Sequence, residues 1–446
     1  MLMKHFRKPI KDQPARENRE TISLSVDSLA FEGWGVGRYG GVVVFVPFTA
    51  PGDTARVRIT QKKKNYWYGE VEEILSPSTQ RTAPHCPLFG VCGGCQWQHL
   101  KYDLQLQAKE QILLDHLRKM APGLQPRIPP FIAAQTPYAY RYRIRLKVRR
   151  FGQECRIGFF QRRSHNLLDV EECAVSHPRI NEVLRNLRSF LRSEGRTLCD
   201  RIQEVELEVS PSSGLCRVLL HVQSPVDSGM GKRVAKGVPS AASVALQSGE
   251  EEGEARQRSI REESEEEDWE TEEGVFSQVN LEQNRVLREV VEKYAAVSRE
   301  DRILDLFCGN GNLSLPLAPR VTSILGIDLD PGAVSSARHL AAKQGWKNCQ
   351  FWEMDSLQGV LRLAMSEKDF SLVILDPPRQ GCRPLIEPLC RLRWRRLIYV
   401  SCHPVNLIRD LTLFASCGYE TREIQGIDMF PQTYHSELVA LLAPPC

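Results

Sequence analysis

The C-terminal part of the chain alternates apolar runs with helical stretches, and this pattern constrains the fold more than any other feature. After Phe276 the apolar runs are 303–307, 323–328, 372–376, 397–400 and 438–442. Runs of this kind, joined by helices, are typical of parallel strands buried on both faces. The sequence therefore predicts an α/β, doubly wound Rossmann-like domain over 274–446, with ligands at the carboxyl ends of its strands.

Glycines and acids follow the first strands of this predicted sheet. Gly309 and Gly311 come after the first strand, and the second ends in Asp328, 19 residues past Gly309. Glycines let a nucleotide approach the backbone, and an acid there accepts both ribose hydroxyls. The third glycine of the dinucleotide motif is missing, and nearby acids suit a cationic sulfonium. S-adenosylmethionine therefore fits better than the cofactor of a dehydrogenase, with Asp355 expected at the adenine amino group.

Two reactive side chains stand near the C-terminus. Cys402 lies in Val-Ser-Cys-His-Pro, downstream of the segment from Asp376 to Arg379, and Glu437 lies in Tyr-His-Ser-Glu-Leu-Val. A thiol there can attack a substrate held against the cofactor, and the carboxylate can accept a proton. The pair indicates covalent chemistry rather than simple binding, although Cys402 has the alternative of capping a strand as a small apolar residue.

A second set of cysteines lies nearer the N-terminus. Cys86, Cys92 and Cys95 are close in sequence and are interrupted by glycines that let the loop wrap around an ion. Cys173 is the best candidate for a fourth ligand. Four thiolates suit either tetrahedral zinc or an iron–sulfur cluster, and their spacing does not choose between the two.

Length and composition set the remaining expectations. A chain of 446 residues predicts two or three domains. It has no 18-residue apolar run and no apolar N-terminal stretch, so we expect a cytoplasmic protein that uses no membrane. In that reducing compartment its 14 cysteines are not expected to form a disulfide framework, and scattered ones such as Cys199 are expected to be buried fillers.

Charge is distributed unevenly along the chain. Residues 250–273 carry 13 acidic and 3 basic side chains, which leaves the remainder with a net charge of +14. A body this basic suggests a polyanionic partner. The region 226–273 is rich in Ser, Gly and Glu and poor in apolar residues, which predicts a flexible acidic linker.

The N-terminal third predicts a barrel after a short tail over 1–19. Strands are expected at 22–26, 41–46, 55–59 and 70–74, which favours an OB-like barrel over 20–80. The segment 62–68 places three lysines before three aromatics. Such a segment either binds single-stranded nucleic acid or is a solvated hairpin with its aromatics folded onto the barrel, and the sequence favours neither.

A mixed α+β central domain is predicted over 81–225, with a helix near 101–119. Its clearest strand is 141–149, in which Tyr142, Ile144, Leu146 and Val148 alternate with five cations. Because side chains alternate along a strand, all five cations share one face. We interpret that face as a surface for RNA in preference to a solvated edge strand.

Taken in order, these motifs resemble the RNA uracil-5-methyltransferase family, most closely its 23S rRNA branch, which has a TRAM domain and an iron–sulfur cluster. The likeness covers nearly the whole chain. The cysteine motif followed by Gln96-Trp-Gln-His99 implies a 4Fe-4S cluster on Cys86, Cys92, Cys95 and Cys173. The segment from Phe276 to Asn280 implies that Gln278 contributes to the active site.

The resemblance also implies the other site residues. Cys402 is the implied nucleophile and Glu437 the base, and Asp376 belongs to the family's Asp-Pro-x-Arg motif. The implied cofactor residues are Gln278, Phe307, Asn312, Asp328, Asp355 and Asp376. Two features depart from the family: His403 replaces a frequent Asn, and the acidic region before Phe276 lies where relatives usually keep strands.

The expected reaction is transfer of a methyl group from S-adenosylmethionine to carbon 5 of a 23S rRNA uridine, through a bond between Cys402 and carbon 6. Glu437 is expected to remove the proton from carbon 5, and we expect a monomer. The alternatives are a tRNA uridine as the substrate, a non-catalytic RNA-binding or ribosome-assembly factor, and a zinc-binding RNA module.

Overall fold

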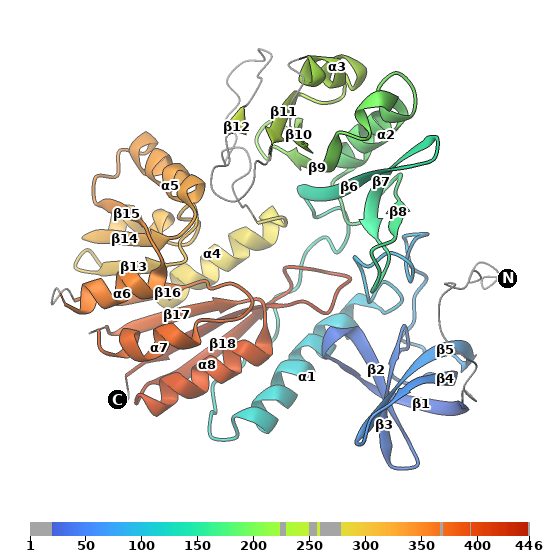
Figure 1. Ribbon diagram of the computed structural model, residues 1–446. Coiled ribbons are helices and arrows are strands. Elements are labelled where there is room, and N and C mark those ends of the chain that lie inside the picture. The colour runs from blue at the N-terminus through green and yellow to red at the C-terminus, as the bar shows by residue number, and fades with distance from the viewer. Residues whose placement is uncertain are drawn as a thin grey trace. The chain divides into compact units, whose positions relative to one another are not determined.

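The computed structural model describes residues 20–223, 229–248, 257–258, 278–365, 369–392 and 394–444 (Figure 1). The chain divides into two compact units, Met1–Arg81 and Thr82–Cys446, each described here by itself. The predicted tail over 1–19 and most of the acidic region lie outside the described residues. Among the helices of the described ranges, none combines the length and the apolar character needed to cross a membrane.

The first unit is a closed barrel in the strand order β1-β2-β3-β5-β4, which confirms the predicted small barrel. Its core consists of alternate residues such as Leu24, Val44 and Val57. Its elements are β1 Thr21–Ala30, η1 Phe31–Gly33, β2 Trp34–Tyr39, β3 Val42–Pro47, β4 Thr54–Lys62 and β5 Tyr66–Ser76.

The sequence did not predict β2, because glycines interrupt its apolar alternation. Both glycines lie where the backbone is crowded. A Cβ at Gly35 would lie 1.9 Å from Thr49 Oγ1, and one at Gly37 would lie 2.2 Å from the Ser25 carbonyl oxygen. Gly35 and Gly37 interrupt the alternation by which a strand is predicted, and the same two glycines allow the close backbone contacts of the barrel.

The lysine and aromatic segment 62–68 forms the β4–β5 hairpin. Tyr66 and Tyr68 both contact Phe45, at ring-centroid distances of 5.8 and 5.7 Å. Lys62 Nζ lies 4.2 Å from the ring centroid of Trp67. These contacts fit aromatics folded onto the barrel, yet Tyr66 remains 37% exposed on the same surface.

The second unit contains a seven-stranded sheet in the order β12-β11-β10-β9-β6-β7-β8. Two helices cover one face of it, and their buried residues join the apolar side of the strands in one core. Its elements are β6 Arg143–Phe151, β7 Glu154–Phe160, β8 Leu167–Asp169, α2 Pro178–Arg192, η2 Arg196–Leu198, β9 Ile202–Val209, β10 Cys216–Val222, α3 Met230–Gly237, β11 Ser243–Ser248 and β12 Gln257–Arg258.

The prediction of a flexible linker over 226–273 is wrong for residues 229–248. They form α3 and β11, and β11 pairs in parallel with β10 over the whole range from Ser243 to Ser248. Met230, Val234, Val244 and Leu246 are buried in the core of this sheet. The few apolar residues of the region are therefore spaced so that they pack into the core of this sheet. The average composition of the region does not reveal that spacing. Most of the strongly acidic run lies outside the described residues.

The basic strand alternates as predicted but does not present a free RNA-binding face. Ile144, Leu146 and Val148 are buried. On the other face Arg143 pairs with Glu206 at 2.6 Å, and Lys147 pairs with Glu204. Because β6 lies between β9 and β7, it is not an edge strand either. Acidic residues on the neighbouring strand β9 thus neutralise much of the predicted basic surface.

The structure also contains a disulfide. Cys155 on β7 bonds to Cys199, and both residues are buried in the core of the sheet. The expectation that Cys199 is buried is confirmed, and its bond to Cys155 is a feature that the sequence did not predict. The two residues are 44 positions apart, so their proximity is a product of the fold rather than of local sequence.

The C-terminal sheet has the order β15-β14-β13-β16-β17-β19-β18, and its first five strands are parallel. This confirms the predicted doubly wound sheet. Its elements are α4 Leu281–Ala295, β13 Arg302–Leu306, η3 Leu315–Arg320, β14 Ser323–Asp328, α5 Pro331–Lys343, β15 Cys349–Glu353, α6 Ser356–Ala364, β16 Leu372–Leu375, α7 Arg383–Cys390, β17 Arg396–Ser401, α8 Pro404–Ser416, β18 Glu420–Ile427 and β19 Glu437–Ala443.

Helices cover both faces of this sheet (Figure 1). One core joins alternate strand residues, such as Leu304 and Leu375, to α6, α7 and α8. The intervening residues, such as Ile303 and Ile374, pack against α4 and η3. Helix α1 (Tyr102–Met120), which the sequence assigns to the central domain, packs with α8 on the first of these faces.

A substitution that creates a cavity beside β11 tests whether residues 229–248 are part of the central sheet. We expect Leu246→Ala to lower the free energy of unfolding by about 2–5 kcal/mol, because it empties a fully packed site. Gln247→Ala, on the opposite face of the strand, is the matched control and is expected to change it by less than about 0.5 kcal/mol. Urea denaturation followed by circular dichroism measures both, and equal small effects would contradict the assignment of β11.

Candidate active site

Cys402 and Glu437 lie side by side because of how β19 joins the sheet. Strand β19 runs antiparallel to β17, with Ser401 opposite Leu438. Continuing that register by one residue places Cys402 opposite Glu437. The two side chains are close enough for the Glu437 carboxylate to raise the pKa of the thiol. The structure thus brings together the two reactive residues that the sequence singles out.

A third residue of this site, Arg379, lies beside the thiol. Burial raises the pKa of Cys402, and the carboxylates of Glu437 and Asp376 add to that effect. The Arg379 guanidinium opposes it, since it attracts the thiolate and hydrogen-bonds to it. Arg379 is therefore the cation at this site that favours the thiolate form of Cys402.

Helix α8 holds the loop that carries Arg379. The Asn406 amide donates to the Arg379 carbonyl oxygen at 2.7 Å, and Arg409 donates to the Gln380 carbonyl at 2.8 Å. The buried Asp410 carboxylate accepts from the Cys382 N–H at 2.9 Å. His403 caps the start of this helix, where its Nδ1 accepts from the Asn406 N–H at 3.3 Å. The loop is therefore held by α8 at Arg379, Gln380 and Cys382.

Four carboxyl groups gather at the edge of the sheet where the parallel strands end. Burial, together with neighbouring carboxylates such as Asp328, raises the pKa of Asp305 and of Asp376 to about 7 each. Burial and Asp376 raise the pKa of Glu437 well above its usual value. Such a group of acids costs free energy when it is ionised without a cation. The site is therefore suited to a positively charged ligand.

The loop after β13 has the backbone of a nucleotide site. Phe307 has a φ of 60°, in the left-handed region that a bulky side chain seldom adopts. Strain of this kind is retained where surrounding contacts demand it, often at a ligand site. The Gly309 N–H donates to Asp328 Oδ2 at 2.8 Å. Asn312 and Asn284 exchange amide hydrogen bonds of 2.8 and 2.9 Å, which tie this loop to α4.

The two remaining cofactor candidates lie at the margins of this loop. Asp355 is exposed after β15, and its carboxylate caps α6 by accepting from the N–H groups of Leu357 and Gln358. Gln278 is partly buried just before α4, whereas Phe276 lies outside the described residues. The Asn280 side chain caps α4 and donates to the Met429 carbonyl at 3.0 Å. The contact between Asn280 and Met429 places the end of the predicted motif 276–280 against the chain that leads to Glu437.

The four predicted cysteine ligands lie near one another. Cys173 raises the pKa of Cys86, Cys92 and Cys95, which shows that the thiols interact. Burial is the larger cause, and it raises the pKa of Cys95 to about 12. Within the described ranges, however, no group of three or more His, Cys, Asp or Glu side chains is arranged to hold a metal ion.

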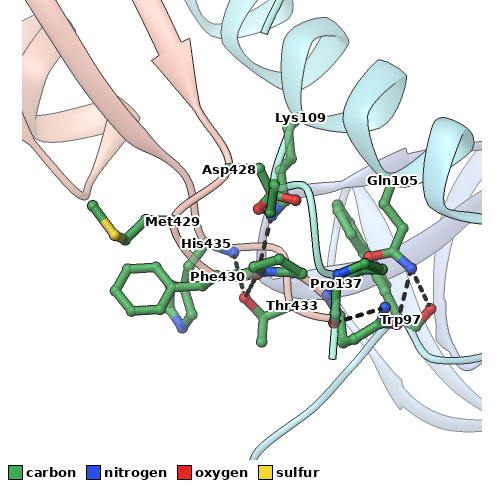
Figure 2. A network of polar contacts seen from close by, with 12 residues as sticks. Trp97, Gln105, Lys109, Pro137, Asp428, Met429, Phe430, Thr433 and His435 are labelled. Atoms are coloured by element: carbon green, nitrogen blue, oxygen red, sulfur yellow. Dashed lines mark hydrogen bonds and ion pairs between the residues drawn. The ribbon is translucent and has the colours of Figure 1, made fainter. Parts of the chain in front are cut away.

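Two features of the site were not predicted from the sequence. Arg141 lies half-buried beside the cysteines, where its charge opposes the rise in the pKa of Cys92 and Cys95. A network of buried polar contacts also surrounds the segment 428–436, which leads to Glu437 (Figure 2). The charge of Arg141 was visible in the sequence, but its partners are distant in sequence and no local pattern indicates them.

Comparison with known proteins identifies the family. The model for tRNA (uracil-5-)-methyltransferases matches residues 256–444, and that for the TRAM domain matches residues 15–71. An uncharacterised RNA methyltransferase of Thermosynechococcus vestitus is 34% identical over 95% of this chain and 98% of its own. A 23S rRNA (uracil(1939)-C(5))-methyltransferase of Pectobacterium atrosepticum is 33% identical over 95% of this chain and 93% of its own.

A solved structure shares the fold. It is the Pyrococcus abyssi tRNA (uracil-54, C5)-methyltransferase in complex with S-adenosyl-L-homocysteine, with a TM-score of 0.70 and 24% identity. The alignment covers 94% of this chain and all of that one. The sequence relatives, the similar fold and the pairing of Cys402 with Glu437 agree with one another. The chain belongs to the RNA uracil-5-methyltransferase family.

Proposed function

We propose that the protein methylates carbon 5 of a specific uridine in 23S rRNA, with S-adenosylmethionine as the methyl donor and a covalent bond between Cys402 and uracil as the intermediate. The observation that carries this proposal is the position of Cys402 opposite Glu437, beside a group of buried carboxyls. The choice of rRNA is supported by relatives named as 23S rRNA methyltransferases that match 95% of the chain.

The residues of the β13 edge are suited to hold the methyl donor. Asp328, at the end of β14, would accept the ribose hydroxyls, and Asp355 would bind the adenine amino group. Phe307, Asn312 and Gln278 would complete the site. S-adenosylmethionine supplies an electrophilic methyl group on a positively charged sulfur, a charge that the buried acids at this edge can neutralise.

Cys402 supplies the nucleophile. Carbon 5 of uracil does not attack a methyl group unaided, because the ring is electron-poor. Addition of the Cys402 thiolate to carbon 6 gives an enolate whose carbon 5 carries the electron pair that forms the new bond. Arg379 favours the thiolate, since its charge opposes the rise in the pKa of Cys402 that burial and the carboxylates cause. Asp376 would hydrogen-bond near the edge of the uracil.

Glu437 is suited to complete the reaction as a base. After methyl transfer, carbon 5 still carries its hydrogen, and Glu437 would remove that proton so that the bond from carbon 6 to Cys402 can break. Burial raises the pKa of Glu437, which makes its carboxylate a stronger base than an exposed one. Elimination then regenerates the thiolate and releases the methylated uridine.

The TRAM barrel is suited to the RNA. Lys62, Lys63 and Lys64 are exposed at the β4–β5 hairpin, next to the partly exposed ring of Tyr66. Cations that bind phosphates and an aromatic face that stacks on a base are typical of single-strand binding. The target uridine must leave its stack to reach Cys402, which requires base flipping or an unpaired site.

A tRNA uridine is the second candidate substrate. The matching family model and the solved structure of similar fold both carry tRNA in their names. Because the chemistry at carbon 5 is the same for either RNA, the residues around Cys402 do not discriminate between them.

Transfer of tritiated methyl groups to unmodified 23S rRNA and to bulk tRNA tests the function. We expect label on rRNA; label on tRNA alone would change the substrate, and label on neither would point to a non-catalytic RNA-binding factor. Cys402→Ala is expected to abolish transfer, and Glu437→Gln to slow it by about 10²–10⁴-fold while a covalent RNA adduct accumulates. Cys417→Ala, an exposed cysteine away from the site, is the matched control.

The group of acids predicts that cofactor binding releases protons. Because the pKa values of Asp305 and Asp376 are raised to about 7, both are largely protonated at pH 6. A sulfonium lowers these pKa values, so its binding releases on the order of one proton, and affinity rises as the pH increases through 7. Calorimetry in buffers of different ionisation enthalpy measures the release. S-adenosylhomocysteine, which lacks the sulfonium charge, is expected to release fewer protons; equal release for both ligands would contradict this account.

We also propose that Cys86, Cys92, Cys95 and Cys173 bind a 4Fe-4S cluster. A single zinc ion requires four sulfurs that each lie about 2.3 Å from the metal. A 4Fe-4S cluster is larger, so its four thiolates lie farther apart. Four interacting thiols, the nearby charge of Arg141 and the Gly94 N–H that donates to Cys92 Sγ at 3.4 Å support this. The cluster would be structural, because methyl transfer moves no unpaired electron.

Purification without oxygen tests the cluster. We expect a brown protein with absorbance near 400 nm and about four irons per chain. Cys92→Ser is expected to lose the colour and to weaken folding or RNA affinity while cofactor binding persists. Cys390→Ser, outside the set, is expected to keep the iron. One zinc per chain with no iron would contradict the proposal, as would full methylation by cluster-free protein.

A further inference from the structure

The segment 428–436 connects β18 to β19 and ends directly before Glu437. At its start, Lys109 of α1 forms an ion pair with Asp428, and neither side chain is exposed to solvent (Figure 2). The Lys109 ammonium also donates to the Phe430 carbonyl oxygen at 3.2 Å. The Tyr102 hydroxyl donates to the second oxygen of Asp428 at 2.8 Å. Two residues of α1 thus bind the beginning of the segment.

Gln105, one turn before Lys109 on the same helix, binds the middle of the segment. Its side-chain oxygen accepts from the Gln432 N–H at 2.9 Å, and its nitrogen donates to the Gln432 side-chain oxygen at 3.0 Å. Gln432 has a φ of 69°, an unfavourable conformation for a residue with a side chain. A buried residue keeps such a conformation only where its contacts require it.

Contacts from two other parts of the chain complete the network. The N–H groups of Gln96 and Trp97, which directly follow the cysteine loop, donate to the Gln432 carbonyl at 3.1 and 3.0 Å. From the start of α4, Gln283 donates to the Asp428 carbonyl at 3.1 Å. The carbonyl oxygens of Asp428 to Phe430 and of Gln432 therefore bond outside the segment, which fixes its path.

The end of the segment lies close enough to Arg379 and His403 for their charges to act on His435. The His435 N–H donates to Thr433 Oγ1 at 3.2 Å, and the Thr433 hydroxyl donates to the Phe430 carbonyl at 2.8 Å (Figure 2). Burial, together with the charges of Arg379, Lys109 and other nearby cations, lowers the pKa of His435 to about 3, so its ring is neutral at pH 7. The contacts with α1 therefore fix the path of the segment, and the segment in turn fixes the position of Glu437, the first residue of β19.

We infer that Gln105 and Lys109 of α1 are positioning residues, which hold the segment 428–436 so that Glu437 can reach carbon 5 of the uracil bound to Cys402. The inference rests on the proposed role of Glu437 as the base. Proton removal is the step most sensitive to a displaced carboxylate, since a shift of about 1 Å costs on the order of 10²-fold in rate. Formation of the covalent bond depends on Cys402, which lies just after β17, and on Arg379, which lies in the loop after β16.

This separation of steps gives the inference a measurable consequence. If α1 positions Glu437, then Gln105→Leu and Lys109→Met leave bond formation intact and slow the release of the adduct. We expect kcat to fall about 10- to 100-fold, KM for RNA to change by less than about threefold, and the adduct fraction to rise toward that of Glu437→Gln. A network that only stabilises the fold would instead lower adduct and product together.

The experiment is single-turnover and steady-state methylation with adduct measured on denaturing gels, using the full-length protein. Arg217→Met is the matched control, because it breaks a buried ion pair with Glu208 in the central sheet and leaves 428–436 untouched. We expect it to lose stability without a change in adduct fraction. If Lys109→Met does not fold, Tyr102→Phe removes only the hydroxyl bound to Asp428 and is expected to raise the adduct fraction by a smaller amount.

Each outcome decides a different claim. An active wild-type protein with variants whose adduct fraction stays at the wild-type level would overturn the positioning role alone. A wild-type protein that forms neither adduct nor methylated RNA would overturn the proposed function, and the positioning role with it. The inference would also be contradicted if Arg217→Met raised the adduct fraction as much as Lys109→Met does. Any loss of stability would then be enough to raise the adduct fraction.

Discussion

The antiparallel pairing of β19 with β17 is the interaction on which the site depends. In the parallel part of the sheet, acids collect where strands end, as Asp328 does in β14 and Asp376 does just after β16. Because β19 runs in the opposite direction, its first residue lies at that same edge. Glu437 thereby joins acids that lie at strand ends, and Cys402, at the end of β17, becomes its neighbour. A parallel strand in this place would carry the carboxylate to the far edge.

Electrostatics explain why this edge suits a cationic methyl donor. Several carboxyls share a small buried volume, and their pKa values rise because ionisation without a cation is unfavourable. Arg379 is the cation that opposes this field at Cys402. A sulfonium would relieve the repulsion among the acids and leave Glu437 free to act as a carboxylate. In the proposed mechanism, the methyl donor and Glu437 are therefore coupled through charge.

The sequence predicted the C-terminal sheet well, because buried parallel strands are continuous apolar runs and their motifs are local. It failed where partners are distant. The alternation of β6 predicts an RNA surface at its cations, because nothing local indicates that Glu204 and Glu206 lie opposite them. Lys109 and Asp428 are 319 residues apart, so their ion pair has no local signal either. Strand β11 was missed because its few apolar residues are diluted by Ser, Gly and the acidic run that follows.

The central claim is that Cys402 forms a covalent bond with the target uracil. RNA transcribed with 5-fluorouridine tests it most directly, because fluorine at carbon 5 cannot be removed as a proton and the adduct persists after methyl transfer. Digestion and mass spectrometry of the complex formed with S-adenosylmethionine locate the bond. The account predicts a methylated fluorouridine attached to the peptide that contains Cys402. An adduct on a different residue, or methylation of the same RNA without any adduct, would contradict it.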